Sequence, residues 1–138
     1  EVNIGLVVDV EAGLLIPVLE DVDRRSLVEI ASDSRRLASA ARDGSLRPED
    51  MGKKSMSVSN LGMFGVDLVL PIIDMPDALM LGVGAIRERV LSVDGEPRVR
   101  PVAALSVSAD HRVLSGVMAA RFLDAVVSRI EQPYEIMG

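Results

Sequence analysis

The sequence predicts a mixed α/β fold, a sandwich in which helices cover a largely mixed sheet. Along the chain the pattern predicts a strand-rich segment, a helix, further strands, a hairpin and a last helix, without an internal repeat or a linker. The 138 residues are 49% apolar and 26% charged, ordinary proportions for a globular domain. A chain of this length suits a single domain with a core of its own, so residues 1–138 are treated as one unit.

The first elements are predicted to be two short strands. Residues 2–10 alternate loosely and are rich in Val and Ile, which favours a strand. Residues 11–19 follow, with Gly13 in a tight connection and Pro17 near the end of a short apolar run. We expect the two segments to form a hairpin.

A helix is predicted within residues 21–46. Ser26 with Glu29 three residues later has the form of a capping box, and Gly44 stands where a helix would end. Apolar residues recur at helical spacing on one face, with arginines on the other. The apolar face comprises Leu27, Ile30, Leu37 and Ala41.

The middle of the chain is expected to alternate between loops and strands. Residues 47–54 form a polar loop with one possible helical turn. Residues 55–74 open as a strand and break at Gly62 and Gly65. Residues 62–82 are more apolar than an isolated surface favours, which predicts an interface, although simple core packing explains the pattern equally well.

Two long β-type runs and a last helix complete the fold. Asp94-Gly95 joins the runs 79–93 and 98–109, a strong hairpin signal. Residues 116–131 return to helical spacing. Their apolar stripe comprises Met118, Phe122, Val126 and Ile130.

Composition excludes several classes of function. The formal net charge of −6 opposes binding to a phosphate backbone. The best candidate for a basic patch is a group of four arginines, Arg87, Arg89, Arg98 and Arg100. Their alternate spacing is typical of the polar face of two neighbouring strands. The absence of cysteine excludes disulfides and thiolate metal sites. No apolar stretch is long enough to cross a bilayer and no signal peptide is evident. We therefore expect a cytoplasmic protein that binds neither nucleic acid nor membrane.

His111 is the single histidine, and it lies between Asp110 and Arg112 where the last predicted strand meets the last helix. A lone histidine at a strand end is often structural. Neighbouring charges and a loop position favour a general base, because imidazole exchanges protons near neutral pH. A metal site is disfavoured, because the chain has no second histidine and no cysteine. No Gly-x-Ser-x-Gly element for a serine nucleophile is present.

The run "DHRVLSG" resembles the Asp-His-Arg-x-x-Asp-Gly signature of the dihydrolipoamide acyltransferases, the core components of 2-oxoacid dehydrogenase complexes. Further segments agree in order and spacing across the whole chain, namely "VNIGLVVD", "GLLIPV", "SLVEIA", "SVSNLGMFGVD", "PIIDMPDALMLGVGAIRER" and "ARFLDAV". The resemblance implies a fold like that of chloramphenicol acetyltransferase. It also implies that residues 1–138 are the C-terminal portion of the catalytic domain, without its N-terminal part or the lipoyl and subunit-binding modules.

The resemblance implies a reaction and assigns residues to it. Family members transfer an acyl group between a lipoyl arm and the thiol of coenzyme A, both as substrates, and need no metal. His111 matches the general base, and Ser59, 52 residues upstream, matches the hydroxyl that stabilises the oxyanion. Asp110, Arg112 and Gly116 belong to the same signature and are expected to support the site. The lipoyl lysine lies outside this chain, and no residue is assigned to coenzyme A binding. From the residue alone, Ser59 reads as a strand-end turn residue.

Ser115 departs from the family pattern, which most often has aspartate there. Serine serves as a helix N-cap as well as aspartate does, so a supporting polar contact is expected at this position. The departure keeps open a second hypothesis, a non-catalytic structural subunit of the complex core. A free-standing acetyltransferase of the chloramphenicol type is disfavoured, because the residues around His111 follow the dehydrogenase-complex pattern.

The resemblance also implies partners. Family members form homotrimers with active sites shared between subunits, so His111 of one chain would face Ser59 of a neighbour. Trimers assemble into cubic or dodecahedral cores that work with the lipoyl domain, a decarboxylase and dihydrolipoamide dehydrogenase. Ile136 and Met137 would form the apolar knob between trimers. Neither the acyl group, whether acetyl, succinyl or branched-chain, nor the size of the core follows from the sequence.

Overall fold

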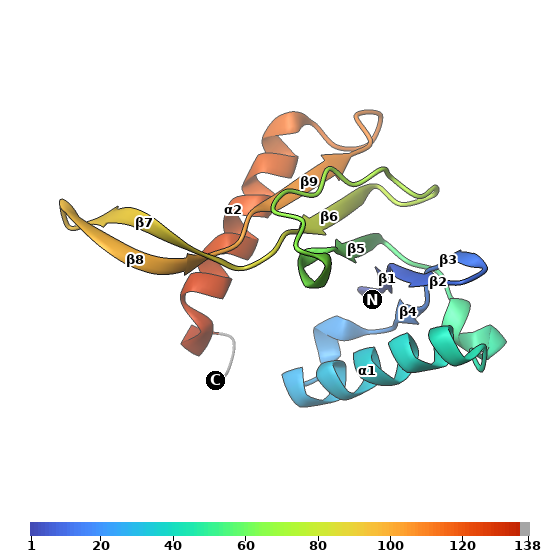
Figure 1. Ribbon diagram of the computed structural model, residues 1–138. Helices are drawn as coiled ribbons and strands as arrows, with labels where there is room; N and C mark the ends of the chain where they lie inside the picture. Colours follow the sequence, from blue (N-terminus) through green and yellow to red (C-terminus); the bar gives the residue numbers. More distant parts are fainter. Residues whose placement is uncertain (136–138) are drawn as a thin grey trace.

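The computed structural model describes residues 1–135 and contains a five-stranded mixed sheet (Figure 1). The strand order is β4-β1-β5-β6-β9. The central pairs β1–β5 and β5–β6 are parallel, and the outer pairs β1–β4 and β6–β9 are antiparallel. The bounds are β1 (Ile4–Leu6), β4 (Val18–Leu19), β5 (Met56–Asn60), β6 (Leu79–Val83) and β9 (Leu105–Ala109). The predicted mixed α/β fold is confirmed.

Helix α1 (Leu27–Asp43) packs against β4 and the adjoining hairpin strand β2 (Val8–Val10). The predicted capping box is present, because the Glu29 N–H donates to Ser26 Oγ at 3.3 Å and the Ser26 N–H donates to Glu29 Oε2 at 2.8 Å. The helix ends at Gly44, whose φ of 69° favours glycine. Of the predicted apolar face, Leu37 and Ala41 are buried, whereas Leu27 is exposed in the first turn.

Helix α2 (Gly116–Glu131) has the predicted bounds and packs on β9. Ser115 caps it by accepting a hydrogen bond from the Met118 N–H at 3.3 Å. Its predicted apolar stripe is only partly covered, since Met118 and Ile130 at its two ends are exposed. The helix lies along the edge strand, so the sheet covers only part of its circumference.

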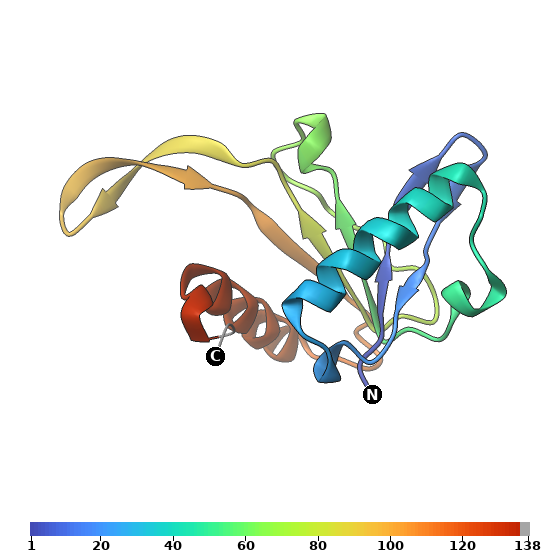
Figure 2. The ribbon, with the colours of Figure 1, turned by 90° about the horizontal axis from the view of Figure 1, so that it is seen from below.

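Two hairpins leave the main sheet, and the longer one extends as an arm away from the body (Figures 1 and 2). The shorter hairpin pairs β2 with β3 (Gly13–Leu15), as predicted. The arm pairs β7 (Arg87–Val93) with β8 (Glu96–Val102). Asp94 and Gly95 form its turn with φ of 54° and 81°, the positive values that a two-residue turn of this kind requires.

Each of the two long β-type runs divides into two strands, which the sequence pattern did not predict. The break after β6 falls at Gly84, whose N–H donates to the Ala104 carbonyl at 3.0 Å. A Cβ at Gly84 would lie 2.1 Å from the Asp67 carbonyl oxygen. The crossing of a distant segment therefore fixes this break and requires glycine there.

The four arginines of the arm share one face, as their spacing predicts. The register sets Arg89 opposite Arg100, and Arg98 opposite Leu91. Arg87 and Arg89 both form ion pairs with Asp67, at 2.9 and 3.1 Å.

The predicted helical turn in residues 47–54 is a 3-10 helix, Pro48–Met51, that buries the carboxylate of Asp50. Asp50 Oδ1 accepts from Arg36 Nη2 at 2.9 Å, and Oδ2 accepts from the Arg47 N–H at 2.9 Å. The Arg47 side chain first, and then that of Arg36, hold the pKa of Asp50 far below its usual value. The cluster therefore joins α1 to the loop before β5.

This cluster should make stability depend on pH in the acid range. A carboxyl group with a lowered pKa in the folded state stabilises the protein above its unfolded pKa, near 4, and loses that contribution as the pH falls further. We expect Asp50→Asn to lower the free energy of unfolding at pH 7, with the difference from wild type shrinking below about pH 4. Urea unfolding of the full-length protein at pH 7, 4 and 2.5 measures this, with Glu88→Gln, at an exposed position on the arm outside the cluster, as the control. A difference that persists unchanged at pH 2.5 contradicts it.

Candidate functional site

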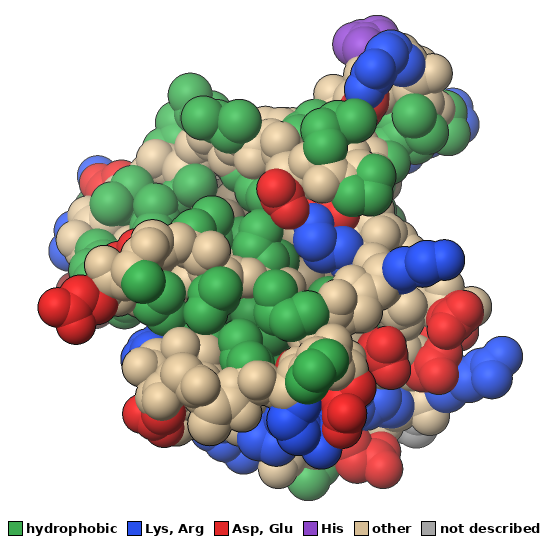
Figure 3. Space-filling view, turned by 90° about the vertical axis from the view of Figure 1, so that its right-hand side faces the viewer, with side chains coloured by type: hydrophobic (Ala, Val, Ile, Leu, Met, Phe, Trp, Pro, Cys, Tyr) green, Lys and Arg blue, Asp and Glu red, His purple; other side chains and the backbone are tan. Residues whose placement is uncertain are grey.

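His111 lies in the turn between β9 and α2, as predicted, and its side chain is exposed. The turn is anchored at Asp110, whose N–H donates to the Ala78 carbonyl and whose carbonyl accepts from the Val113 and Leu114 N–H groups, each at 2.9 Å. In Figure 3 the single histidine stands at the tip of a projection of the surface. The imidazole is therefore open to an approaching substrate.

The neighbouring charges bind each other instead of the histidine ring. Arg112 Nη2 lies 2.6 Å from Asp110 Oδ2, and the Arg112 N–H donates to Asp110 Oδ1 at 2.9 Å. The side chain of Arg112 first, and then its backbone N–H, lower the pKa of Asp110 to about 2. Within residues 1–135 neither side chain hydrogen-bonds the imidazole. The pair thus fixes the backbone on both sides of His111.

Ser115 and Gly116 connect this turn to α2. The hydroxyl of Ser115 is engaged as the helix N-cap. A Cβ at Gly116 would lie 4.0 Å from His111 Nε2, an ordinary contact distance, so the start of α2 lies next to the ring. The two residues set where the helix begins relative to the histidine.

Ser59 lies on β5 among four serines that share one face of the sheet. It pairs with Gly82, which pairs with Ser106, and the parallel row two residues away contains Ser57 and Ser108. Three of the four hydroxyls hold the segment that crosses this face, since Ser106 donates to the Val69 carbonyl, Ser108 to the Pro71 carbonyl and Ser57 to Asp77.

The hydroxyl of Ser59 is the exception. It forms no hydrogen bond with the other residues that the structure describes, and the residue is 9% exposed. A hydroxyl in this state is able to donate to a substrate without giving up an internal partner.

One chain does not bring Ser59 and His111 together. Ser59 lies level with Ser106, and β9 continues three residues to Ala109 before the turn begins. A strand rises about 3.3 Å per residue, so the backbones at the two positions lie about 10 Å or more apart along the sheet. Within this one chain the two side chains therefore stand at separate places on the sheet.

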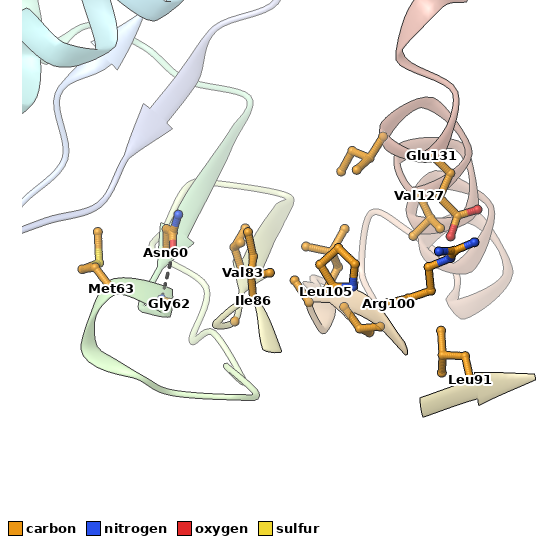
Figure 4. Close-up of a pocket in the computed structure, with 15 residues that line it drawn as sticks. Asn60, Gly62, Met63, Val83, Ile86, Leu91, Arg100, Leu105, Val127 and Glu131 are labelled. Atoms are coloured by element: carbon orange, nitrogen blue, oxygen red, sulfur yellow. Dashed lines mark hydrogen bonds between the residues drawn. The ribbon is translucent and has the colours of Figure 1, made fainter. Parts of the chain in front are cut away.

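A cavity of about 1020 Å³ lies at the base of the arm and was not predicted. Figure 4 shows it between Asn60 and Gly62 at the end of β5 and Val127 and Glu131 of α2. The Gly62 N–H donates to Asn60 Oδ1 at 2.9 Å and fixes the turn on that side. Neither His111 nor Ser59 lines this cavity.

Apolar side chains are exposed along the segment that the sequence marked as a possible interface. In Figure 3 apolar side chains spread over the middle and left of the face, beside the projection that carries the histidine. The segment contributes Met63, Phe64, Leu68, Leu70, Ile72 and Met75. Exposed apolar groups in this number are typical of a surface that a partner covers.

Two negative findings, on metal sites and on membrane-spanning helices, apply to residues 1–135. No group of three or more His, Asp or Glu side chains in this range is arranged to hold a metal ion. No helix in the same range is long and apolar enough to span a membrane.

The chain is similar to known proteins along its whole length. Residues 1–138 match the family model described as 2-oxoacid dehydrogenases acyltransferase (catalytic domain). The chain is 38% identical to the Bacillus subtilis dihydrolipoyllysine-residue acetyltransferase component of the pyruvate dehydrogenase complex, over 98% of this chain and 30% of that protein. A Bartonella vinsonii succinyltransferase component of the 2-oxoglutarate dehydrogenase complex is 38% identical over 99% of this chain and 33% of its own length. The chain thus spans about a third of these curated relatives.

Solved structures agree in fold. The Azotobacter vinelandii dihydrolipoamide acetyltransferase superposes with a TM-score of 0.92 at 34% identity, covering 99% of this chain and 56% of that one. A truncated catalytic core from Thermoplasma acidophilum gives a TM-score of 0.86 at 36% identity, covering 96% and 58%. In the Azotobacter enzyme the residues investigated for a catalytic role are a serine, a histidine 52 residues later and an asparagine four residues after that. The chain belongs to the 2-oxoacid dehydrogenase acyltransferase family and is part of its catalytic domain.

Proposed function

We propose that this chain transfers an acyl group between dihydrolipoamide and coenzyme A in the core of a 2-oxoacid dehydrogenase complex. The observation that carries the proposal is the pair Ser59 and His111, which has the residue types and the 52-residue spacing of the serine and histidine investigated in the Azotobacter enzyme. The exposed imidazole and the unengaged hydroxyl support these roles.

The proposed reaction needs one base and one hydrogen-bond donor from the protein. The His111 imidazole accepts the proton of the coenzyme A thiol, and the sulfur attacks the carbonyl carbon of the acyl-lipoyl thioester. The carbonyl oxygen becomes an oxyanion, and the Ser59 hydroxyl donates a hydrogen bond to it. The tetrahedral intermediate then expels the lipoyl sulfur, which takes the proton back from the imidazolium. Acyl-coenzyme A and dihydrolipoamide are the products.

We further propose that the active site is completed between subunits of a homotrimer. The separation of Ser59 from His111 within one chain supports this arrangement, and the exposed apolar side chains of residues 63–75 offer a surface for the second chain. A similar solved structure, at 34% identity, is the cubic core of a pyruvate dehydrogenase multienzyme complex. A cubic or dodecahedral core served by a lipoyl domain, a decarboxylase and dihydrolipoamide dehydrogenase is part of the same proposal. The knob assigned to Ile136 and Met137 lies outside the described residues.

The place of residues 1–138 within the protein also stays a prediction. The chain covers 56% and 58% of two solved catalytic chains, which supports its being a portion of a larger catalytic domain. That this portion is the C-terminal one is expected from the resemblance of its motifs. A cytoplasmic location is expected on the same family basis.

A second candidate function is a non-catalytic core subunit, and Ser115 is the observation that favours it. The Azotobacter enzyme has an asparagine four residues after its histidine, whereas the Ser115 hydroxyl is engaged as a helix cap. The serine side chain is shorter than that of asparagine, and its hydroxyl already accepts a hydrogen bond from the first turn of α2. It is therefore less able to reach a reacting group.

Acyl transfer by the full-length protein and by Ser115→Asp distinguishes the two candidates. We expect the wild type to form acyl-coenzyme A with one of the acetyl, succinyl and branched-chain donors. Ser115→Asp should change kcat by less than about tenfold, because aspartate also caps a helix. A silent wild type that gains activity on this substitution contradicts catalysis and supports the structural subunit.

A further inference from the structure

We propose that Lys54 is a positioning residue for acyl transfer, holding the turn that carries His111 through the segment Asp74–Asp77. The inference rests on the proposed function. Lys54 lies just before β5, and its hydrogen bonds and ion pairs among residues 1–135 are with Asp74 and Asp77 and not with the turn of His111, so its effect passes through the segment it binds.

Lys54 binds that segment with its ammonium group at two points. Nζ lies 2.8 Å from Asp74 Oδ2 and 2.8 Å from Asp77 Oδ2. The side chain of Asp77 is fully buried, and its Oδ2 also accepts a hydrogen bond from Ser57 Oγ at 2.6 Å. Its Oδ1 is buried with no partner among residues 1–135, so Lys54 supplies the only cation for this carboxylate in that range.

The aliphatic part of the Lys54 side chain is enclosed, as is its ammonium group. Its side chain is only 11% exposed. A Cβ at Gly5 of β1 would lie 2.7 Å from Lys54 Cδ and 2.4 Å from Ser57 Oγ. Glycine on the neighbouring strand thus leaves the space that Lys54 and Ser57, the two side chains bound to Asp77, fill.

The turn that carries His111 contacts the same segment on both sides of the histidine. Before it, the Asp110 N–H donates to the carbonyl of Ala78, the residue that follows Asp77, at 2.9 Å. After it, Arg112 Nη2 lies 3.7 Å from the sulfur of Met75, which stands between the two aspartates. Both contacts would move if residues 74–77 moved.

Loss of the ammonium group would leave the Asp77 carboxylate buried without a counter-charge. Such a carboxylate is costly, and the segment would shift to hydrate it. A base that acts on a thiol must lie within hydrogen-bond reach, and misplacement by 1 Å costs up to about a hundredfold in rate. Lys54 therefore acts on kcat, through the position of the imidazole.

The test measures kcat and KM for coenzyme A and for acyl-dihydrolipoamide in the full-length protein. We expect Lys54→Met to lower kcat by about ten- to a hundredfold, with both KM values within about twofold of wild type. Lys54→Arg keeps the cation and should recover kcat to within about fivefold of wild type. Lys53→Met, at the exposed neighbouring position, is the matched control and should behave as wild type.

Each outcome bears on the proposal. A wild-type kcat in Lys54→Met, or a loss that Lys54→Arg does not recover, overturns it. Should Lys54→Met fail to fold, Lys54→Gln keeps a hydrogen-bond donor but removes the charge that Asp77 needs, and an unchanged kcat there overturns the proposal equally. His111→Ala, assayed alongside, separates the two claims. Full activity of His111→Ala rejects the proposed mechanism, whereas an inactive His111→Ala with a normal Lys54→Met rejects only the positioning role.

Discussion

Replacing His111 by alanine in the full-length protein is expected to lower kcat for acyl transfer by about 10²- to 10⁴-fold. The imidazole is the only side chain of this chain that is suited to take a proton from a thiol at neutral pH, because the chain has one histidine and no cysteine. The carboxylate adjacent in sequence, Asp110, is bound by Arg112, which lowers its pKa and makes it a weak base.

The loss of activity should occur without loss of stability. The His111 side chain is exposed, and its turn is held by backbone hydrogen bonds of Asp110 that the substitution leaves in place. The thermal midpoint of unfolding should therefore match the wild type. Val113→Ala, at an exposed position in the same turn, is the control and should keep full activity. Undiminished turnover in His111→Ala contradicts the base assignment.

The helices and hairpins could be predicted because their signals are local. Ser26 and Glu29 are three residues apart, Ser115 caps the helix that it precedes, and Asp94-Gly95 makes its own turn. In each case the residues that decide the boundary are neighbours in the chain. Such boundaries depend little on the rest of the fold.

The break after β6 could not be predicted, because it depends on contacts distant in sequence. The strand ends at Gly84 where the backbone of Asp67 crosses it. The exposure of the apolar stripe of α2 likewise depends on its place at an edge strand. Periodicity identifies an apolar face, but it does not say how much of that face the chain itself covers.

The candidate site also combines features that the sequence predicts with features that it does not. The place of His111 at a strand-to-helix joint followed from the pattern of the last 40 residues. The bond between Asp110 and Arg112 could not be read from the pattern, and it forms because a guanidinium two residues away reaches the carboxylate directly. The free hydroxyl of Ser59 and the ion pair of Lys54 with Asp77 depend on sheet register, which joins residues 20 or more positions apart.

Ser59→Ala is expected to lower kcat by about 10²- to 10³-fold, the usual cost of removing one donor to a developing oxyanion. Because the hydroxyl has no hydrogen-bond partner within residues 1–135, the substitution should leave the midpoint of unfolding close to that of wild type. KM for both substrates should change little, since the bond to the oxyanion forms only in the transition state. Steady-state kinetics and thermal unfolding of the full-length protein measure both effects.

Ser57→Ala provides the matched comparison, because it removes the same atom two residues away on the same face. The Ser57 hydroxyl donates to the buried Asp77, so its loss should lower the unfolding midpoint, an effect that Ser59→Ala should not have. If Ser59→Ala lowers the midpoint as Ser57→Ala does and keeps its kcat, the hydroxyl is structural. The alternative result is a fall in kcat in Ser59→Ala with no change in its midpoint of unfolding. That result indicates that the Ser59 hydroxyl bonds a group of the bound substrate.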